Sequence, residues 1–153
     1  MKNIIPTAQE VAEKIRIEFG KKSPDIITTD DIFIKLHGNW YIIPKGFRSD
    51  GASLPWIMTF LVDRKNENII LFSILHDYFY RTQFVPRFYA DAIYENGLKE
   101  TAGLSVSRTF YLGLRIAGGV AWRNNQKKGL QKYPDAYQRM INHVCEVEKK
   151  ELK

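Results

Sequence analysis

A nearly unbroken apolar stretch at residues 69–80 contains a histidine and an aspartate side by side, His76 and Asp77. Its apolar residues cover more than one helical face, so the stretch is expected to form a helix packed on several sides. Two ionisable groups inside such a helix are costly unless each has a partner. The fold therefore has to bring polar partners to this helix, which points to a functional site.

Chain length, hydrophobic content and net charge indicate one folded domain with a basic surface. The 153 residues, 44% of them hydrophobic, fit a single domain over residues 1–153 with a real core. The net charge of +6 favours an anionic membrane surface, nucleic acid or an acidic protein as partner. The basic residues at 123–132 have no interleaved aromatic residues and match no nucleic-acid module, so nucleic acid is the least favoured. Cys145 is the only cysteine, which excludes an intramolecular disulfide.

The sequence predicts neither export by the general route nor insertion in a membrane. The N-terminal residues lack the apolar segment of a signal peptide. The longest mostly apolar run, residues 109–122, is shorter than the ~20 residues that cross a bilayer.

The first third of the chain predicts a helix and a hairpin. Thr7 and Glu10 form a capping box, and apolar residues at helical spacing extend the expected helix to a stop at Gly20. Residues 23–31 are expected to form a loop. Residues 32–36 and 40–43 predict a β-hairpin, with residues 47–50 as an extended edge.

The remainder predicts helices, with Gly, Pro or polar connectors between them. The expected ranges are 54–62, 67–81, 86–101, 105–123 and 135–150. The fold class is therefore α+β, with a small antiparallel sheet beside a mainly helical bundle that has an antiparallel central helix pair.

An antiparallel arrangement of the two central helices would bring His76 and Asp91 to nearly the same level, since both lie a similar distance from the connector. Tyr80, four residues after His76, shares its face and can hydrogen-bond the same carboxylate. Asp77 is turned about 100° away. One carboxylate can then orient the histidine, while the other stays free for a metal or a substrate.

This arrangement has a chemical use. An imidazole held by a buried carboxylate is a general base with a fixed tautomer, able to deprotonate water if its ring faces a solvent-reachable hollow. A neighbouring carboxylate beside an oxygen-lined loop can hold Ca²⁺, which polarises a carbonyl group.

A pair of motifs resembles the signatures of small phospholipases A2, above all the disulfide-free viral type: His76-Asp77-x-x-Tyr80 and Ala90-Asp91-x-x-Tyr94. The resemblance implies that His76 is the general base, Asp91 its orienting partner and Tyr80 a support for Asp91. It also implies that Asp77 is a calcium ligand. The glycine-rich calcium loop of those enzymes has no standard counterpart, and the one candidate is residues 49–53, where Asp50 would contribute.

A longer pattern resembles an uncharacterised family encoded by phages and prophages. It spans residues 46–122 and comprises Asp50-Gly-Ala-Ser53-x-Pro55, the two motifs above, Arg115-x-x-Gly118 and Trp122. The resemblance implies action in the host cytoplasm or in the phage particle, with a host or phage protein as a further candidate partner.

Other residues have two interpretations each. Ser53 is either a nucleophile with His76 as its base or, more simply, the cap of a helix that begins at Leu54. Asp50 belongs to a turn or to a metal site. Arg115 is expected to form a structural salt bridge with an aspartate. The apolar segment 54–62 is either core or a lipid-facing patch, whereas His37 and His143 are expected to be solvated.

Two functions remain open from the sequence. The first is a phage-type His/Asp hydrolase, phospholipase A2-like, in which His76 activates water for ester hydrolysis. The second is a non-enzymatic phage accessory or virion-associated protein-binding module with a structural His-Asp cluster. A zinc hydrolase is a weaker third hypothesis, because zinc prefers more nitrogen or sulfur ligands than one histidine supplies.

Overall fold

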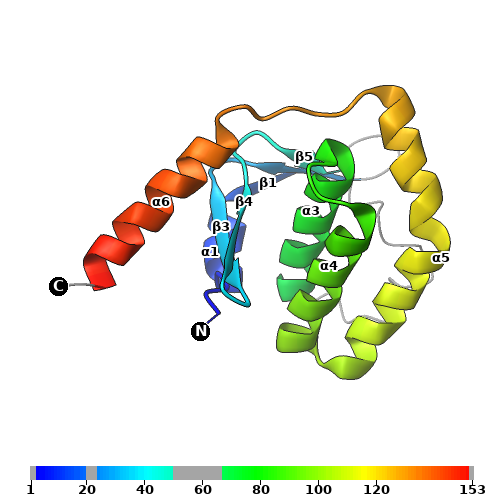
Figure 1. The fold of residues 1–153 in the computed structure, drawn as a ribbon, viewed down its shortest axis with the longest axis horizontal. Helices are drawn as coiled ribbons and strands as arrows, with labels where there is room; N and C mark the ends of the chain where they lie inside the picture. The colour runs from blue at the N-terminus through cyan, green and yellow to red at the C-terminus, as the bar shows by residue number, and fades with distance from the viewer. Residues whose placement is uncertain (1–2, 20–23, 50–66, 152–153) are drawn as a thin grey trace.

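Two small antiparallel sheets lie between the C-terminal helix and a group of three packed helices (Figure 1). The computed structural model describes residues 3–19, 24–49 and 67–151. Its elements are α1 (Ala8–Glu13), β1 (Ile15–Phe19), β2 (Pro24–Thr28), β3 (Ile32–Leu36), β4 (Asn39–Ile43), β5 (Arg48–Ser49), α3 (Glu67–Thr82), α4 (Arg87–Ala102), α5 (Leu104–Lys128) and α6 (Ala136–Glu151). This α+β architecture confirms the predicted fold class.

The predicted hairpin is present as β3 and β4. The two strands pair from Ile32↔Ile43 to Leu36↔Asn39 and are joined by a two-residue turn. Both turn residues are left-handed, His37 at φ 50° and Gly38 at φ 83°, as the favoured two-residue hairpin turn requires. Ile32, Ile34 and Leu36 alternate with less buried residues, so the hairpin presents one apolar face to the helices.

The second sheet corrects two predictions. The capping box of Thr7 and Glu10 is confirmed, but its helix ends at Glu13 and residues 15–19 form β1. Apolar and charged residues alternate along β1, and its β-branched isoleucines favour an extended strand. The loop expected at residues 23–31 is also wrong over residues 24–28, which form β2 between β1 and β5. Pro24 lies at the first position of that strand, where its missing N–H is tolerated.

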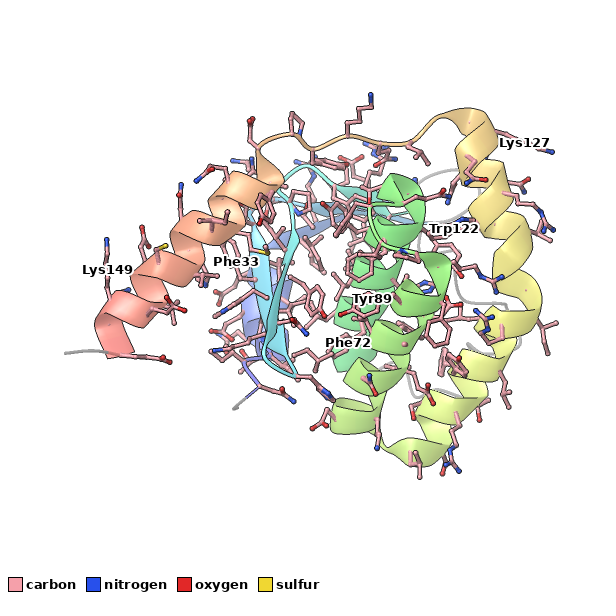
Figure 2. The ribbon with its side chains drawn as sticks, viewed as in Figure 1. Phe33, Phe72, Tyr89, Trp122, Lys127 and Lys149 are labelled. Atoms are coloured by element: carbon pink, nitrogen blue, oxygen red, sulfur yellow. The ribbon has the colours of Figure 1, made fainter. Side chains whose placement is uncertain are left out.

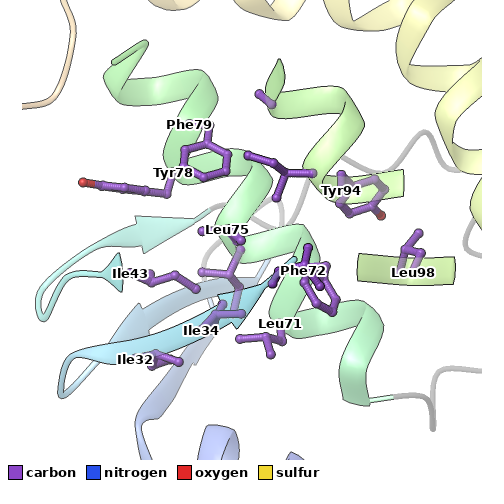
Figure 3. Close-up of a cluster of buried hydrophobic side chains, with 14 of the residues drawn as sticks. Ile32, Ile34, Ile43, Leu71, Phe72, Leu75, Tyr78, Phe79, Tyr94 and Leu98 are labelled. Atoms are coloured by element: carbon purple, nitrogen blue, oxygen red, sulfur yellow. The ribbon is translucent and has the colours of Figure 1, made fainter. Parts of the chain in front are cut away.

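A single hydrophobic cluster joins the hairpin to the helices (Figure 3). Ile34 and Ile43 of the hairpin belong to it with Leu75 and Phe79 of α3, all of them almost without solvent exposure. α4 and α5 add further buried residues, among them Ala90, Leu98, Phe110 and Leu114. Sheet and helices therefore share one core.

The central helices follow the predicted order. α3 and α4 pack against each other as an antiparallel pair, and α5 packs mainly on α4 (Figure 1). Within the described ranges no helix is both long and apolar enough to span a bilayer. The expected helix at residues 54–62 lies outside the described residues, as do Asp50 and Ser53.

Candidate functional site

The predicted contact between the two central helices is present. The Nε2 atom of His76 on α3 lies 3.0 Å from Oδ1 of Asp91 on α4. The hydroxyl of Tyr80 donates a hydrogen bond of 2.7 Å to the same oxygen. Asp91 is completely buried, and the His76 and Tyr80 side chains are almost so. The antiparallel packing of α3 and α4 thus brings these three residues together, as their spacing predicted.

Two arginines approach the second oxygen of the same carboxylate. The Nη1 atom of Arg115 on α5 donates to Oδ2 of Asp91 at 3.1 Å, which confirms the expected salt bridge of Arg115. The Nε atom of Arg87 lies 3.5 Å from Oδ2. Arg87 also donates to the Tyr80 hydroxyl at 3.2 Å and to the carbonyl of Leu114 at 2.8 Å. Asp91 therefore connects three helices.

Arg87 is the site residue that the sequence analysis missed. It lies four residues before Asp91, at the spacing that places two side chains on one helical face. That spacing could have identified the pair. The carbonyl contacts of Arg87 on α5 could not have been foreseen, because they depend on how α5 packs.

The surrounding groups keep Asp91 ionised. Burial raises the pKa of this carboxyl, but hydrogen bonds from His76, Tyr80 and Arg115 outweigh burial and hold the pKa below its usual 3.8. Burial and the bond to Asp91 raise the pKa of Tyr80, so its hydroxyl remains a donor. The result is a negative charge fixed beside an imidazole.

The orientation of His76 leaves its second nitrogen available. Its Nδ1 atom makes no hydrogen bond with any residue in the described ranges. The ring contacts Tyr80 and Tyr94, with centroids 4.2 and 5.0 Å away. The side chain is only 3% exposed. A large hollow of about 560 Å³ lies elsewhere, between β4, the end of α3 and the start of α6, so it does not open onto this ring.

Asp77 corrects a prediction. It was expected to remain free, yet its Oδ2 atom accepts a hydrogen bond of 3.0 Å from Nε of Arg81, and its side chain is buried. The reason is again the i,i+4 spacing on one helix, which the sequence analysis did not apply to this pair. Across the described residues there is no group of three or more His, Cys, Asp or Glu side chains that could hold a metal ion.

Gly118 on α5 allows the side chain of Tyr80 to approach this helix closely. A Cβ atom at this position would collide with the hydroxyl of Tyr80. The absence of a side chain therefore gives Tyr80 the space from which it reaches Asp91.

The two remaining histidines lie away from this cluster. His37 lies 3.6 Å from Glu100 and is about half exposed. His143 was expected to be solvated, and this is wrong. Its ring stacks on Phe33 of the hairpin at 3.8 Å, with the edge of Trp40 at 5.2 Å. The late helix packs on the hairpin, a contact that its polar sequence did not predict.

Comparison with known proteins identifies the family. The family model described as "Protein of unknown function (DUF1353)" matches residues 26–113, more than half of the chain. The match includes the last three residues of β2, all of β3 to β5, α3 and α4, and with them His76, Tyr80, Arg87 and Asp91. No curated protein and no solved structure matches the chain. The chain belongs to the DUF1353 family.

Proposed function

We propose that this DUF1353 protein is an ester hydrolase, phospholipase A2-like, in which His76 activates a water molecule. The observation that carries the proposal is the bond between Nε2 of His76 and the ionised Asp91. A carboxylate at Nε2 favours the tautomer with its proton on that nitrogen, which leaves the lone pair on Nδ1. Nδ1 is then the atom that takes a proton from water.

The proposed reaction needs the whole cluster. His76 takes a proton from water as the oxygen attacks the ester carbonyl, and it later returns that proton to the departing alcohol. Asp91 stabilises the imidazolium that forms between these steps. Tyr80, Arg87 and Arg115 act as positioning residues, because they hold Asp91 in place and keep it charged.

Calcium is a separate part of the proposal. The ligands would be Asp77 and Asp50, but Asp77 is paired with Arg81 and presents no uncommitted carboxylate to a cation. Binding would have to displace Arg81, so Asp77 as placed does not fit the ion, and Asp50 lies outside the described residues. We therefore assign no step of the reaction to Ca²⁺.

A second function is favoured by the burial of the cluster. The His76 ring is 3% exposed, and both oxygens of Asp91 are shared by protein groups. Such a network can serve to fix three helices in a non-enzymatic phage accessory or virion-associated module that binds a host or phage protein. A phage or prophage origin, with action in the host cytoplasm or the particle, is part of both proposals.

The deciding experiment measures fatty-acid release from mixed phospholipid vesicles, with Ca²⁺ or with a chelator. We expect turnover by the wild type and a loss of about 10²–10⁴-fold in kcat for His76→Gln, the range that general-base catalysis supplies. Glutamine keeps an amide donor for Asp91, so the melting temperature should change little. The matched control His37→Gln replaces an exposed histidine and should keep full activity.

The two functions give different results. If the cluster is only structural, the wild type has no turnover for His76→Gln to remove. A wild-type protein that releases no acid from phospholipid or from short-chain esters, in either calcium condition, would contradict the hydrolase proposal.

A further inference from the structure

We propose that the outward side of α5 binds membrane surfaces that contain anionic lipid. Three aliphatic side chains on this helix point into solvent at successive turns: Leu112 is 61% exposed, Ile116 84% and Val120 56%. Residues four apart lie on one face of a helix, so the three form a continuous apolar stripe. We call this stripe, with the cations described next, the α5 outer face.

Positive charge surrounds the stripe. The helix carries Arg108, Arg115, Arg123, Lys127 and Lys128, and no aspartate or glutamate lies between Leu104 and Lys128. Arg108 precedes Leu112 by one turn, and Arg123 and Lys127 each follow a stripe residue by two turns, so these three cations share its side of the helix. All three are exposed.

Among the residues that the structure describes, no other element covers this face. α5 forms the edge of the molecule farthest from α6, and its opposite side packs on α4 and α3 through Phe110 and Leu114 (Figure 1). Phe88 of α4 is 63% exposed and lies beside the Arg115 guanidinium, 5.9 Å from ring centroid to Cζ. An exposed aromatic ring of α4 therefore lies beside one of the α5 cations.

Charge and shape together favour a lipid surface as the occupant. A helix with an apolar stripe and basic flanks lies in the interface of a bilayer, its aliphatic groups among acyl chains and its cations at anionic headgroups. Single-stranded nucleic acid is usually held by stacking on aromatic side chains, which the stripe lacks. A second copy would meet the same cations without acidic partners, and each chain carries a net charge of +6.

This inference does not rest on the proposed hydrolysis. A protein that binds vesicles but hydrolyses neither phospholipid nor short-chain esters would contradict the hydrolase proposal and leave the proposal of membrane binding standing. Conversely, a protein that hydrolyses monomeric short-chain esters but does not bind vesicles would support the hydrolase proposal and contradict the proposal of membrane binding.

The test is flotation of the full chain with vesicles of equimolar phosphatidylglycerol and phosphatidylcholine, compared with phosphatidylcholine alone. We expect binding to the anionic vesicles that weakens at high salt, because salt screens exposed charges. Ile116→Asp and the double variant Leu112→Ser/Ile116→Ser should each bind at least about tenfold more weakly. Both sites are exposed, so circular dichroism should show an unchanged fold.

Charge is tested by a matched pair of double variants. Arg123→Gln/Lys127→Gln removes two cations from the α5 outer face and should weaken binding about tenfold or more. Lys149→Gln/Lys150→Gln removes two exposed cations from α6 and should leave binding nearly unchanged. Lys127 and Lys149 lie at opposite ends of the molecule (Figure 2).

Several results would overturn the proposal. The first is that the protein does not bind anionic vesicles, and the second is that both charge variants lose vesicle binding equally. The third is that the protein binds a DNA duplex more tightly than it binds vesicles and that Arg123→Gln/Lys127→Gln abolishes the DNA binding. A fourth result would come from sedimentation equilibrium. If the wild type is a dimer and Ile116→Asp is a monomer, a second copy of the chain covers this face.

Discussion

Asp91 shows how one buried carboxylate can determine the arrangement of a whole site. Its two oxygens receive hydrogen bonds or ion pairs from His76, Tyr80, Arg87 and Arg115. A charge buried in this way is tolerated because each of its oxygens has partners. Removing the charge of Asp91 leaves its partners without an ionised acceptor. The resulting loss in the free energy of unfolding is therefore expected to exceed the contribution of any single hydrogen bond.

Asp91→Asn should therefore lower the free energy of unfolding by about 2–4 kcal/mol, less than a fully enclosed pair would lose because both arginines remain partly exposed. Urea denaturation followed by circular dichroism measures the change. Glu95→Gln, one turn further along α4, is the matched control and should cost under about 0.5 kcal/mol. A loss for Asp91→Asn no larger than that of the control would contradict the structural importance of the cluster.

For single residues, the sequence correctly predicted the contact between His76 and Asp91 on the two central helices. It did not predict that Asp77 pairs with Arg81. The distances of His76 and Asp91 from their shared connector were enough to predict that they meet. The same local rule would have given Arg81 as the partner of Asp77 and Arg87 as that of Asp91, had it been applied to them. The stacking of His143 on Phe33 depends on where α6 packs, which no local pattern reveals.

At the scale of elements, close approach of α5 to α3 depends on Gly118. A glycine to alanine change inside a helix normally stabilises it by about 1 kcal/mol. Here the added methyl group would meet the Tyr80 hydroxyl. We expect Gly118→Ala to destabilise the protein by about 1–3 kcal/mol, as overpacking does. In thermal unfolding, the control Asn124→Ala on the exposed side of α5 should stabilise slightly, and a gain for Gly118→Ala would refute the close contact.

The docking of α6 on the hairpin should depend on pH through His143. Burial lowers the pKa of this ring below its usual 6.5, although Glu146 opposes the effect and Lys14 and Lys150 add to it. The unfolded chain therefore binds the proton more readily than the folded chain. The stability that the neutral ring contributes is complete above about pH 6.5 and is lost as the pH falls through the lowered folded pKa.

Unfolding free energies between about pH 7.5 and 5 measure this dependence. His143→Phe keeps an aromatic ring against Phe33 and should remove the His143 part of the decline. His37→Gln, which changes an exposed histidine, should retain it. Equal pH profiles for the wild type and His143→Phe would show that His143 does not contribute.

The elements themselves were predicted unequally. Helices with long apolar periodicity were placed within a few residues of their ends, as was the hairpin with its two-residue turn. β1 was mistaken for helix because Ile15 and Phe19 lie four apart, which fits a helical face as well as a strand. The pairing of β1 with β2 decides between helix and strand. The sequence did not predict this pairing, because the proline and aspartate at the start of β2 favour a loop.

At the scale of the whole molecule, the shared core predicts one cooperative unfolding transition. Hairpin, α3, α4 and α5 all contribute to a single hydrophobic cluster, so no part of it can separate without exposing the rest. Small single domains with one core usually unfold in an all-or-none manner. We expect urea transitions followed by far-ultraviolet circular dichroism and by tryptophan fluorescence to coincide. Trp40 reports on the hairpin and Trp122 on α5, whereas Trp56 lies outside the described residues.

Phe72→Ala should shift both transitions together. Phe72 is completely buried on α3, and truncating such a side chain costs about 3–5 kcal/mol. Ile17→Ala, at a half-exposed position of β1, is the control and should cost much less. If fluorescence changed at a lower urea concentration than circular dichroism, the hairpin and the helices would be separate folding units. The single domain over residues 1–153 would then have to be divided, since a shared core requires that both probes report the same event.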